Sequence, residues 1–139
     1  MSCSFNVKKG KITNLKYYDG YFDCSGKRLT SLEGCPKEIN GAFECNCNKL
    51  INLKGCPKKI KGAFDCSRNQ LTSLEGCPEK VEGYFTCSYN RLTSLKGCPK
   101  EIKGNFDCSD NQLTNLEGCP EKVEGTFNCS DNPLLVDIS

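Results

Sequence analysis

The sequence contains no histidine and no tryptophan, and it has one methionine among its 139 residues. Without histidine, a Ser-His-Asp triad, a histidine general base and the commonest zinc ligand are all excluded. No apolar run is long enough to span a membrane, and no charged-then-apolar leader opens the chain. We therefore expect a protein that is not an enzyme, needs no cofactor and does not enter a membrane.

An excess of charge of one sign is also missing. Lys and Arg together number 19 and Asp and Glu together number 17, which leaves a formal net charge of +2. A protein whose main partner is a phosphate backbone needs clustered basic residues. We therefore expect no nucleic-acid partner.

The chain is built from a 21-residue repeat that runs without insertion from Gly20 to Ser139. A weaker copy precedes it, with Phe5, Val7, Ile12 and Leu15 in the core positions. The terminal units of a stack differ from the rest because each has one face without a neighbour. We expect one domain with an atypical N-terminal capping repeat (residues 1–19), five 21-residue repeats (residues 20–124), and a truncated C-terminal repeat and cap (residues 125–139).

Within one unit the spacing of apolar residues indicates strand and turn. Apolar or small residues alternate with other residues from Val81 to Cys87, which predicts one strand with a buried face. The return segment from Leu74 to Gly83 contains Gly76 and Pro78, so it has no room for a helix. We expect this segment to be extended or polyproline-like.

The pattern F-x-C-S-x-N-x-L-T-x-L resembles the leucine-rich repeat, with Phe and Cys at two of the usual Leu positions. The Asn turn and the Pro-containing return are similar to the short class, of about 20 to 22 residues, of secreted bacterial effectors. Similar Cys- and Gly-rich versions occur in phage and giant-virus proteins. The resemblance covers essentially the whole chain. It departs at Gly10 and Lys27, where Asn is expected, so we predict irregular turns there.

The resemblance implies a mainly-β repeat solenoid without long helices. In the leucine-rich-repeat arc, one parallel β-sheet of about seven strands forms the concave face, and extended or polyproline-like segments form the convex side. We expect the strands near residues 6, 23, 44, 65, 86, 107 and 128.

Two columns of cysteines, beginning at Cys24 and Cys35, fall at positions that the pattern places inside. Unpaired cysteine is among the most buried residue types, so we expect small buried apolar side chains with reduced thiols, and hence a cytosolic protein. Parallel thiols do not converge as a tetrahedral metal site requires, so we expect no metal. Cys3 and Cys47 lie outside both columns and are expected to be the exposed, reactive thiols.

Two further columns are interpreted as structural. Asn48, Asn69, Asn90, Asn111 and Asn132 should satisfy backbone groups in the turns. The residue after the last Leu alternates in sign, as Glu33, Lys54, Glu75, Lys96 and Glu117. Opposite charges on neighbouring repeats would favour the correct register.

The columns that vary while the rest of the repeat stays constant are the natural place for recognition. Ala42 and Ala63 should form a hollow between Tyr21 and Tyr84, with acidic residues alongside. We interpret this as an acidic, aromatic-walled groove for a Lys- or Arg-bearing segment of a partner protein. The alternative is that Asp is simply common at solvated strand positions. The candidate partner-binding residues are Tyr21, Asp23, Glu44, Asp65, Arg68, Tyr84, Thr86, Tyr89, Asn105 and Asp107.

The resemblance implies a non-catalytic protein–protein interaction module, a phage or bacterial factor that blocks or redirects a host protein in the host cytosol. A structural, ice-binding solenoid is the alternative, since Thr30, Thr72, Thr93 and Thr114 fall in one column, although Ile51 interrupts it. An enzyme using two carboxylates on a sugar is disfavoured because an open sheet does not exclude water. Bare edge strands at the ends leave self-association open.

Overall fold

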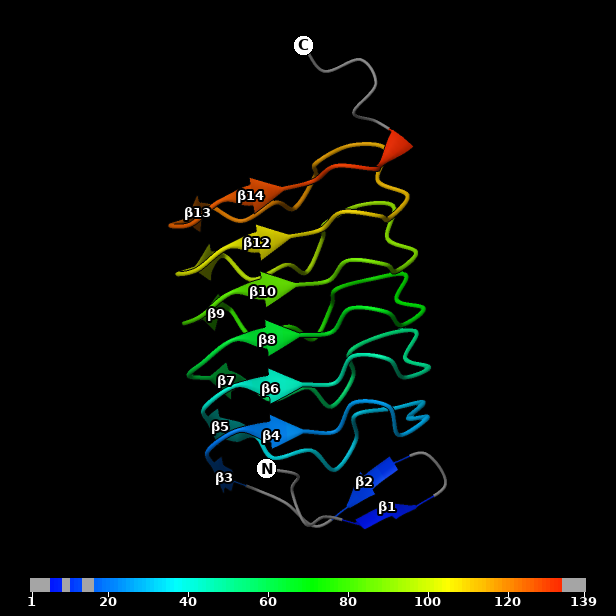
Figure 1. Ribbon diagram of the computed structural model, residues 1–139, viewed down its shortest axis with the longest axis vertical. Helices are drawn as coiled ribbons and strands as arrows, with labels where there is room; N and C mark the ends of the chain where they lie inside the picture. Colours follow the sequence, from blue (N-terminus) through cyan, green and yellow to red (C-terminus); the bar gives the residue numbers. More distant parts are fainter. Residues whose placement is uncertain (1–5, 9–10, 14–16, 134–139) are drawn as a thin grey trace.

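The computed structural model describes residues 6–8, 11–13 and 17–133. These residues form a mainly-β solenoid whose coils stack in a nearly straight column (Figure 1). The expected fold class, a repeat solenoid without long helices, is confirmed. No helix in the described part of the chain is long and apolar enough to cross a membrane.

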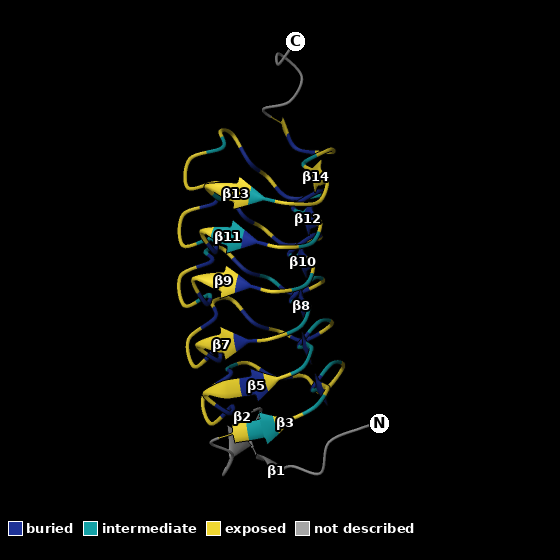
Figure 2. Ribbon diagram, turned by 90° about the vertical axis from the view of Figure 1, so that its left-hand side faces the viewer, coloured by how far each residue is buried: buried dark blue, intermediate teal, exposed yellow. Residues whose placement is uncertain are grey.

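Each coil contributes one strand to each of two six-stranded parallel sheets, which lie on different sides of the stack (Figures 1 and 2). The sheet that we call the Phe sheet contains β4 (Phe22–Asp23), β6 (Phe43–Glu44), β8 (Phe64–Asp65), β10 (Phe85–Thr86), β12 (Phe106–Asp107) and β14 (Phe127–Asn128). The second, the return sheet, contains β3 (Tyr17–Asp19), β5 (Glu38–Asn40), β7 (Lys59–Ile60), β9 (Lys80–Val81), β11 (Glu101–Ile102) and β13 (Lys122–Val123). In both sheets the paired residues hold equivalent positions of neighbouring coils, as Phe64 and Phe85 do.

The expected single sheet of seven strands is corrected by this arrangement. The strand expected near residue 6 is β1 (Asn6–Lys8), which pairs antiparallel with β2 (Lys11–Thr13) instead of joining the Phe sheet. The first unit has a shorter return segment without the Gly-Cys-Pro sequence, so it cannot complete a coil like the others. The return segments form a sheet because β5, β7, β9, β11 and β13 each carry an Ile or Val that packs above the one before, as Ile39 and Ile60 do. In β3 the same position is held by Tyr18.

The strand expected from Val81 to Cys87 is also divided. Its first part is β9 in the return sheet, its second part is β10 in the Phe sheet, and the chain bends at Glu82 and Gly83 between them. A Cβ atom on Gly83 would lie 2.7 Å from the amide nitrogen of Ala63 on the preceding coil. Glycine therefore lets successive coils approach closely at the corner between the two sheets.

The core is a continuous column of side chains that repeats every coil. The core includes five fully buried phenylalanines, Phe22, Phe43, Phe64, Phe85 and Phe106. Two columns of leucine are also fully buried, one from Leu29 to Leu113 and the other from Leu32 to Leu95. The rings of Phe64 and Phe85 stack with their centroids 5.2 Å apart, and those of Phe85 and Phe106 with theirs 5.5 Å apart. Each such pair contributes roughly 0.5–1.5 kcal/mol beyond the burial of its area.

The structural interpretation of the Asn column is confirmed. The side-chain oxygen of Asn90 accepts a hydrogen bond from the amide of Leu71 at 2.9 Å. Its Nδ2 donates to the carbonyl of Cys66 on the preceding coil at 3.2 Å and to the carbonyl of Cys87 on its own coil at 3.0 Å. The same bonds recur one repeat before and after, so each carboxamide joins two coils through otherwise unpaired turn backbone.

The irregular turn expected at Lys27 is present. Gly26 and Arg28 both have positive φ, of 63° and 58°, whereas the next turns each have one such residue, at Cys47 and Arg68. Position 27 has no carboxamide, and Asn48 of the following coil accepts hydrogen bonds from the amides of both Lys27 and Leu29, at 3.0 and 2.8 Å. Gly10, the other expected irregularity, lies outside the described residues.

Opposite charges meet on neighbouring coils along the return side. Lys96 and Glu117, from the column predicted to alternate, are 3.6 Å apart. Lys100 lies 4.0 Å from Glu79, and Lys80 lies 3.9 Å from Glu101. These side chains are largely exposed, so each pair contributes at most about 1 kcal/mol to stability. Their main effect is on register.

Replacing Asn90 with Ala should lower the free energy of unfolding by about 3 kcal/mol, because several buried backbone groups lose their partners at once. Chemical denaturation followed by circular dichroism measures the change. The exposed Gln112→Ala variant, adjacent to Asn111 of the same column, is the matched control and should change stability by less than about 0.5 kcal/mol. Equal effects of the two substitutions would contradict the structural role of the carboxamide.

Candidate functional site

The outward face of the Phe sheet carries the columns in which the repeats differ most. Its strands β4 to β14 are evenly spaced and lie in one layer (Figure 1). The column before Phe begins with the exposed Tyr21 and continues with the half-buried Ala42 and Ala63 and the exposed Tyr84. The column after Phe is half-buried in the first five coils, as Asp23, Glu44, Asp65, Thr86 and Asp107.

Two tyrosines from coils three repeats apart are both within reach of the charge of Glu44. The Tyr21 hydroxyl donates a hydrogen bond to Glu44, and burial, that bond and the charges of Glu44 and Asp23 raise the Tyr21 pKa above its ordinary value. Burial and the charges of Asp65 and Glu44 raise the pKa of Tyr84 as well. Tyr21 therefore interacts with Glu44 through a hydrogen bond, and Tyr84 interacts with it through its charge. We call Tyr21, Glu44, Asp65 and Tyr84 the Tyr–Glu cluster.

The aspartates of this face have a structural role that the sequence interpretation missed. The Oδ1 atom of Asp65 accepts hydrogen bonds from the amide of Ser67 at 2.9 Å and from its hydroxyl at 2.6 Å. Asp23 binds Ser25 in the same way. The sequence signal was the recurrent Asp-Cys-Ser, which is typical of an Asx turn. Glu44 is the exception to this Asp-Cys-Ser pattern, because its coil has the sequence Glu44-Cys45-Asn46.

The remaining candidate residues lie around this cluster rather than in it. Asp107 accepts a bond from the amide of Ser109 at 2.9 Å, and Asn105 accepts one from the amide of Thr126 at 2.9 Å. The Thr86 hydroxyl lies 3.2 Å from that of Ser88. Asp107, Asn105 and Thr86 therefore stabilise local backbone or neighbouring side chains.

Arg68 and Tyr89 form a separate pair at the edge of the turns. The guanidinium of Arg68 lies over the ring of Tyr89, 4.2 Å from its centroid. Both residues have positive φ, of 55° and 56°, which turns their side chains out of the coil. The structure thus brings together Tyr21, Glu44 and Tyr84 and, separately, Arg68 and Tyr89.

The two cysteine columns are inside, as predicted, except towards the C-terminal end. Cys66 and Cys87 are fully buried, and burial raises their thiol pKa values well above the ordinary value. Cys47 is exposed as predicted, and Cys119 is exposed too because few coils follow it. Cys3 lies outside the described residues. Every cysteine in the described ranges is free, and within those ranges no three His, Cys, Asp or Glu residues could hold a metal ion.

Comparisons of the chain with protein-family models, with curated proteins and with solved structures found no match. The resemblance to the leucine-rich repeat therefore stays a prediction from the repeat pattern.

Replacing Glu44 with Gln should lower the pKa of Tyr21 towards that of free tyrosine, because the hydrogen bond to a charged acceptor and its field are lost. Carbon NMR of labelled tyrosine against pH measures the shift, with Tyr21→Phe identifying the signal. Since the folded-state pKa is raised, the stability that this interaction contributes is present at neutral pH and is lost as the pH rises through the folded-state value. An unchanged titration in Glu44→Gln would show that the phenol and Glu44 do not interact.

Iodoacetamide should modify Cys47 and Cys119 in the folded protein well before Cys66 and Cys87. The buried thiols lack access, and their raised pKa values reduce the fraction of reactive thiolate at a given pH. Mass spectrometry after timed labelling gives the order of reaction, and denatured protein serves as the control in which the differences should disappear. Equal rates in the folded state would contradict the packing of the core.

Proposed function

We propose that the protein is a non-catalytic protein-binding module that holds a Lys- or Arg-bearing segment of a partner protein on the outward face of the Phe sheet. The observation that carries this proposal is the Tyr–Glu cluster, in which two exposed aromatic rings flank a carboxylate. A lysine or arginine side chain placed there would meet the Glu44 charge and the faces of both rings. Charge attraction and cation–π contacts would act together.

The cluster is not needed to form the fold, which supports a role in recognition. Tyr21 is 38% exposed and Tyr84 is 44% exposed, although other coils carry Ala, Asn or Thr at the same position. Large exposed aromatic side chains cost solubility and contribute nothing to the Phe column. Tyr is also among the residues that most often carry binding energy at protein interfaces.

The Phe sheet would present this cluster on a rigid surface. The amide of Phe43 donates to the carbonyl of Ala63 at 2.9 Å, and the amide of Cys45 donates to the carbonyl of Asp65 at 2.9 Å. These inter-coil bonds fix the spacing of the residues that would touch the partner. A surface that is already ordered loses little conformational entropy on binding.

The proposal extends to the kind of partner. The resemblance of the repeat to bacterial-effector and phage proteins supports a host protein as the target, blocked or redirected in the host cytosol, an environment that also suits free thiols. Arg68 and Tyr89 would then contact the rim of the partner and contribute less than the cluster.

A fluorescent peptide library with single and paired Lys or Arg residues in extended sequences provides a defined probe. We expect peptides that bind the protein to be basic, and Glu44→Lys to weaken their affinity at least tenfold because it reverses the central charge. Tyr84→Ala should weaken it about three- to tenfold by removing one ring. Fluorescence polarisation measures both changes.

The control for this experiment is Glu33→Lys, which makes the same charge change on the exposed return side of the coil. We expect it to leave peptide affinity unchanged. Asp65 is not used, because its reversal would also break the bonds to Ser67. Affinity that falls equally in Glu33→Lys and Glu44→Lys would reflect net charge alone and would overturn the proposed site.

A further inference from the structure

The return sheet opens between β7 and β9. These strands are paired at Ile60 and Val81 alone, whereas each other neighbouring pair of this sheet is matched at two or three positions. Figure 2 shows the wider spacing of β7 and β9, and Figure 1 shows no such widening between β8 and β10 of the same coils. The coils are therefore splayed on one side only, which makes a wedge-shaped opening that we call the β7–β9 cleft.

The opening leaves backbone groups without the partners that they have elsewhere. The amides of Lys100 and Glu101 both donate to the carbonyl of Glu79, at 2.8 and 3.3 Å. The same pair of bonds occurs between β5 and β7 and between β11 and β13. Among the backbone bonds of the described residues, none joins the amides of Glu79 and Lys80 to the carbonyl of Lys58. Two N–H donors thus border the cleft.

Two lysines occupy the same position of neighbouring coils at this junction. The column that contains Lys59 and Lys80 reads Glu38, Lys59, Lys80, Glu101 and Lys122, so opposite charges alternate along it except between Lys59 and Lys80. Like charges directly opposite each other on neighbouring strands are destabilising. An anion placed between two such ammonium groups would offset their repulsion.

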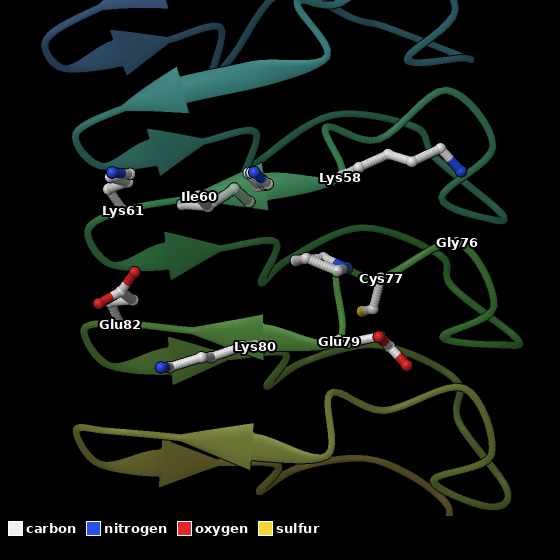
Figure 3. Close-up of a pocket in the computed structure, with 10 residues that line it drawn as sticks. Lys58, Ile60, Lys61, Gly76, Cys77, Glu79, Lys80 and Glu82 are labelled. Atoms are coloured by element: carbon white, nitrogen blue, oxygen red, sulfur yellow. The ribbon is translucent and has the colours of Figure 1, made fainter.

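The β7–β9 cleft has the size and lining of a ligand site. Its volume is about 580 Å3, within the range of roughly 300–1,000 Å3 that is usual for small-molecule pockets. Its lining includes the apolar side chains of Ile60, Cys77 and Pro78 and the lysines Lys58, Lys59, Lys61 and Lys80. Figure 3 shows the cleft between the two coils.

The two acidic residues that line the cleft, Glu79 and Glu82, lie near lysines other than Lys59 and Lys80. Glu79 lies 4.0 Å from Lys100 of the next coil. Glu82 faces Lys61 at the corner of the coil (Figure 3). The cleft is therefore lined by more lysines than glutamates, although Lys80 also lies 3.9 Å from Glu101 of the next coil.

We propose that the β7–β9 cleft binds a small organic anion, a carboxylate or phosphate monoester that carries an apolar group. The anionic group lies between Lys59 and Lys80 and accepts hydrogen bonds from the amides of Glu79 and Lys80. The apolar group packs on Ile60 and Pro78. The site is on the return sheet, so it is independent of the partner-binding face proposed above.

Hydrogen exchange on the protein without ligand tests the opening itself. After correction for intrinsic rates, the amides of Glu79 and Lys80 should exchange at least tenfold faster than those of Lys100 and Glu101, which occupy the same positions one coil later. Equal protection at the two junctions would show that the cleft is closed in solution and would overturn the proposal.

Calorimetric titration tests the ligand class with phenyl phosphate and benzoate as probes. We expect both to bind, and inorganic phosphate and the neutral benzyl alcohol to bind at least tenfold more weakly because each lacks one of the two contacts. Lys59→Gln and Lys80→Gln should each weaken the binding of phenyl phosphate at least fivefold. Binding of benzyl alcohol as tight as that of benzoate, or no binding of either anionic probe, would overturn the assignment.

The matched control is Lys122→Gln, which removes a lysine from the same column at a junction that is fully paired. It should leave the affinity for phenyl phosphate unchanged, and thermal melting should show that all three variants are folded. An equal loss in Lys122→Gln would reflect general charge attraction and would contradict a site at β7 and β9. Peptide binding at the Tyr–Glu cluster should be the same in Lys59→Gln and Lys80→Gln as in the original chain.

Discussion

The bond network of one buried carboxamide per coil holds the solenoid together. Each Asn of the column that starts at Asn48 accepts a bond from a Leu amide of the preceding coil and donates to carbonyls of both coils. A turn buried between stacked coils has no water to satisfy its backbone, so the side chain must do so. Because the bonds reach one repeat back, they fix the register of every coil on the one before it.

The stacked core follows from that register. With the turns aligned, each Phe lies over the Phe of the preceding coil, and the Leu columns close beneath them. The outward residues then line up as well, which is how Tyr21, Glu44 and Tyr84 come to share one surface although they are far apart in the chain. Exact repetition aligns the outward side chains of successive coils into one surface. That surface can be specific for a partner only at the positions where the repeats differ.

The two sheets differ in how firmly they are held. The Phe sheet has aromatic stacking behind it and the Asn network at its end, whereas strands β5 to β13 of the return sheet have one Ile or Val each and carry exposed charges. The return sheet opens where Lys59 and Lys80 occupy the same position of neighbouring coils. The Phe sheet stays evenly spaced in the same coils, where the rings of Phe64 and Phe85 stack.

The repeat alone was enough to predict a solenoid without helices, the buried Phe, Leu and Cys columns, the structural role of Asn90 and the irregular turn at Lys27, because each depends on a residue type at a fixed spacing. It did not predict the second sheet, the corner at Gly83 or the antiparallel pairing of β1 with β2. Period two continues unbroken from Val81 to Cys87, so the bend shows only in the close approach of neighbouring coils. The approach of two tyrosines to the charge of Glu44, the Asp–Ser bonds and the cleft between β7 and β9 were likewise decided by tertiary structure, since they depend on where side chains from different coils meet.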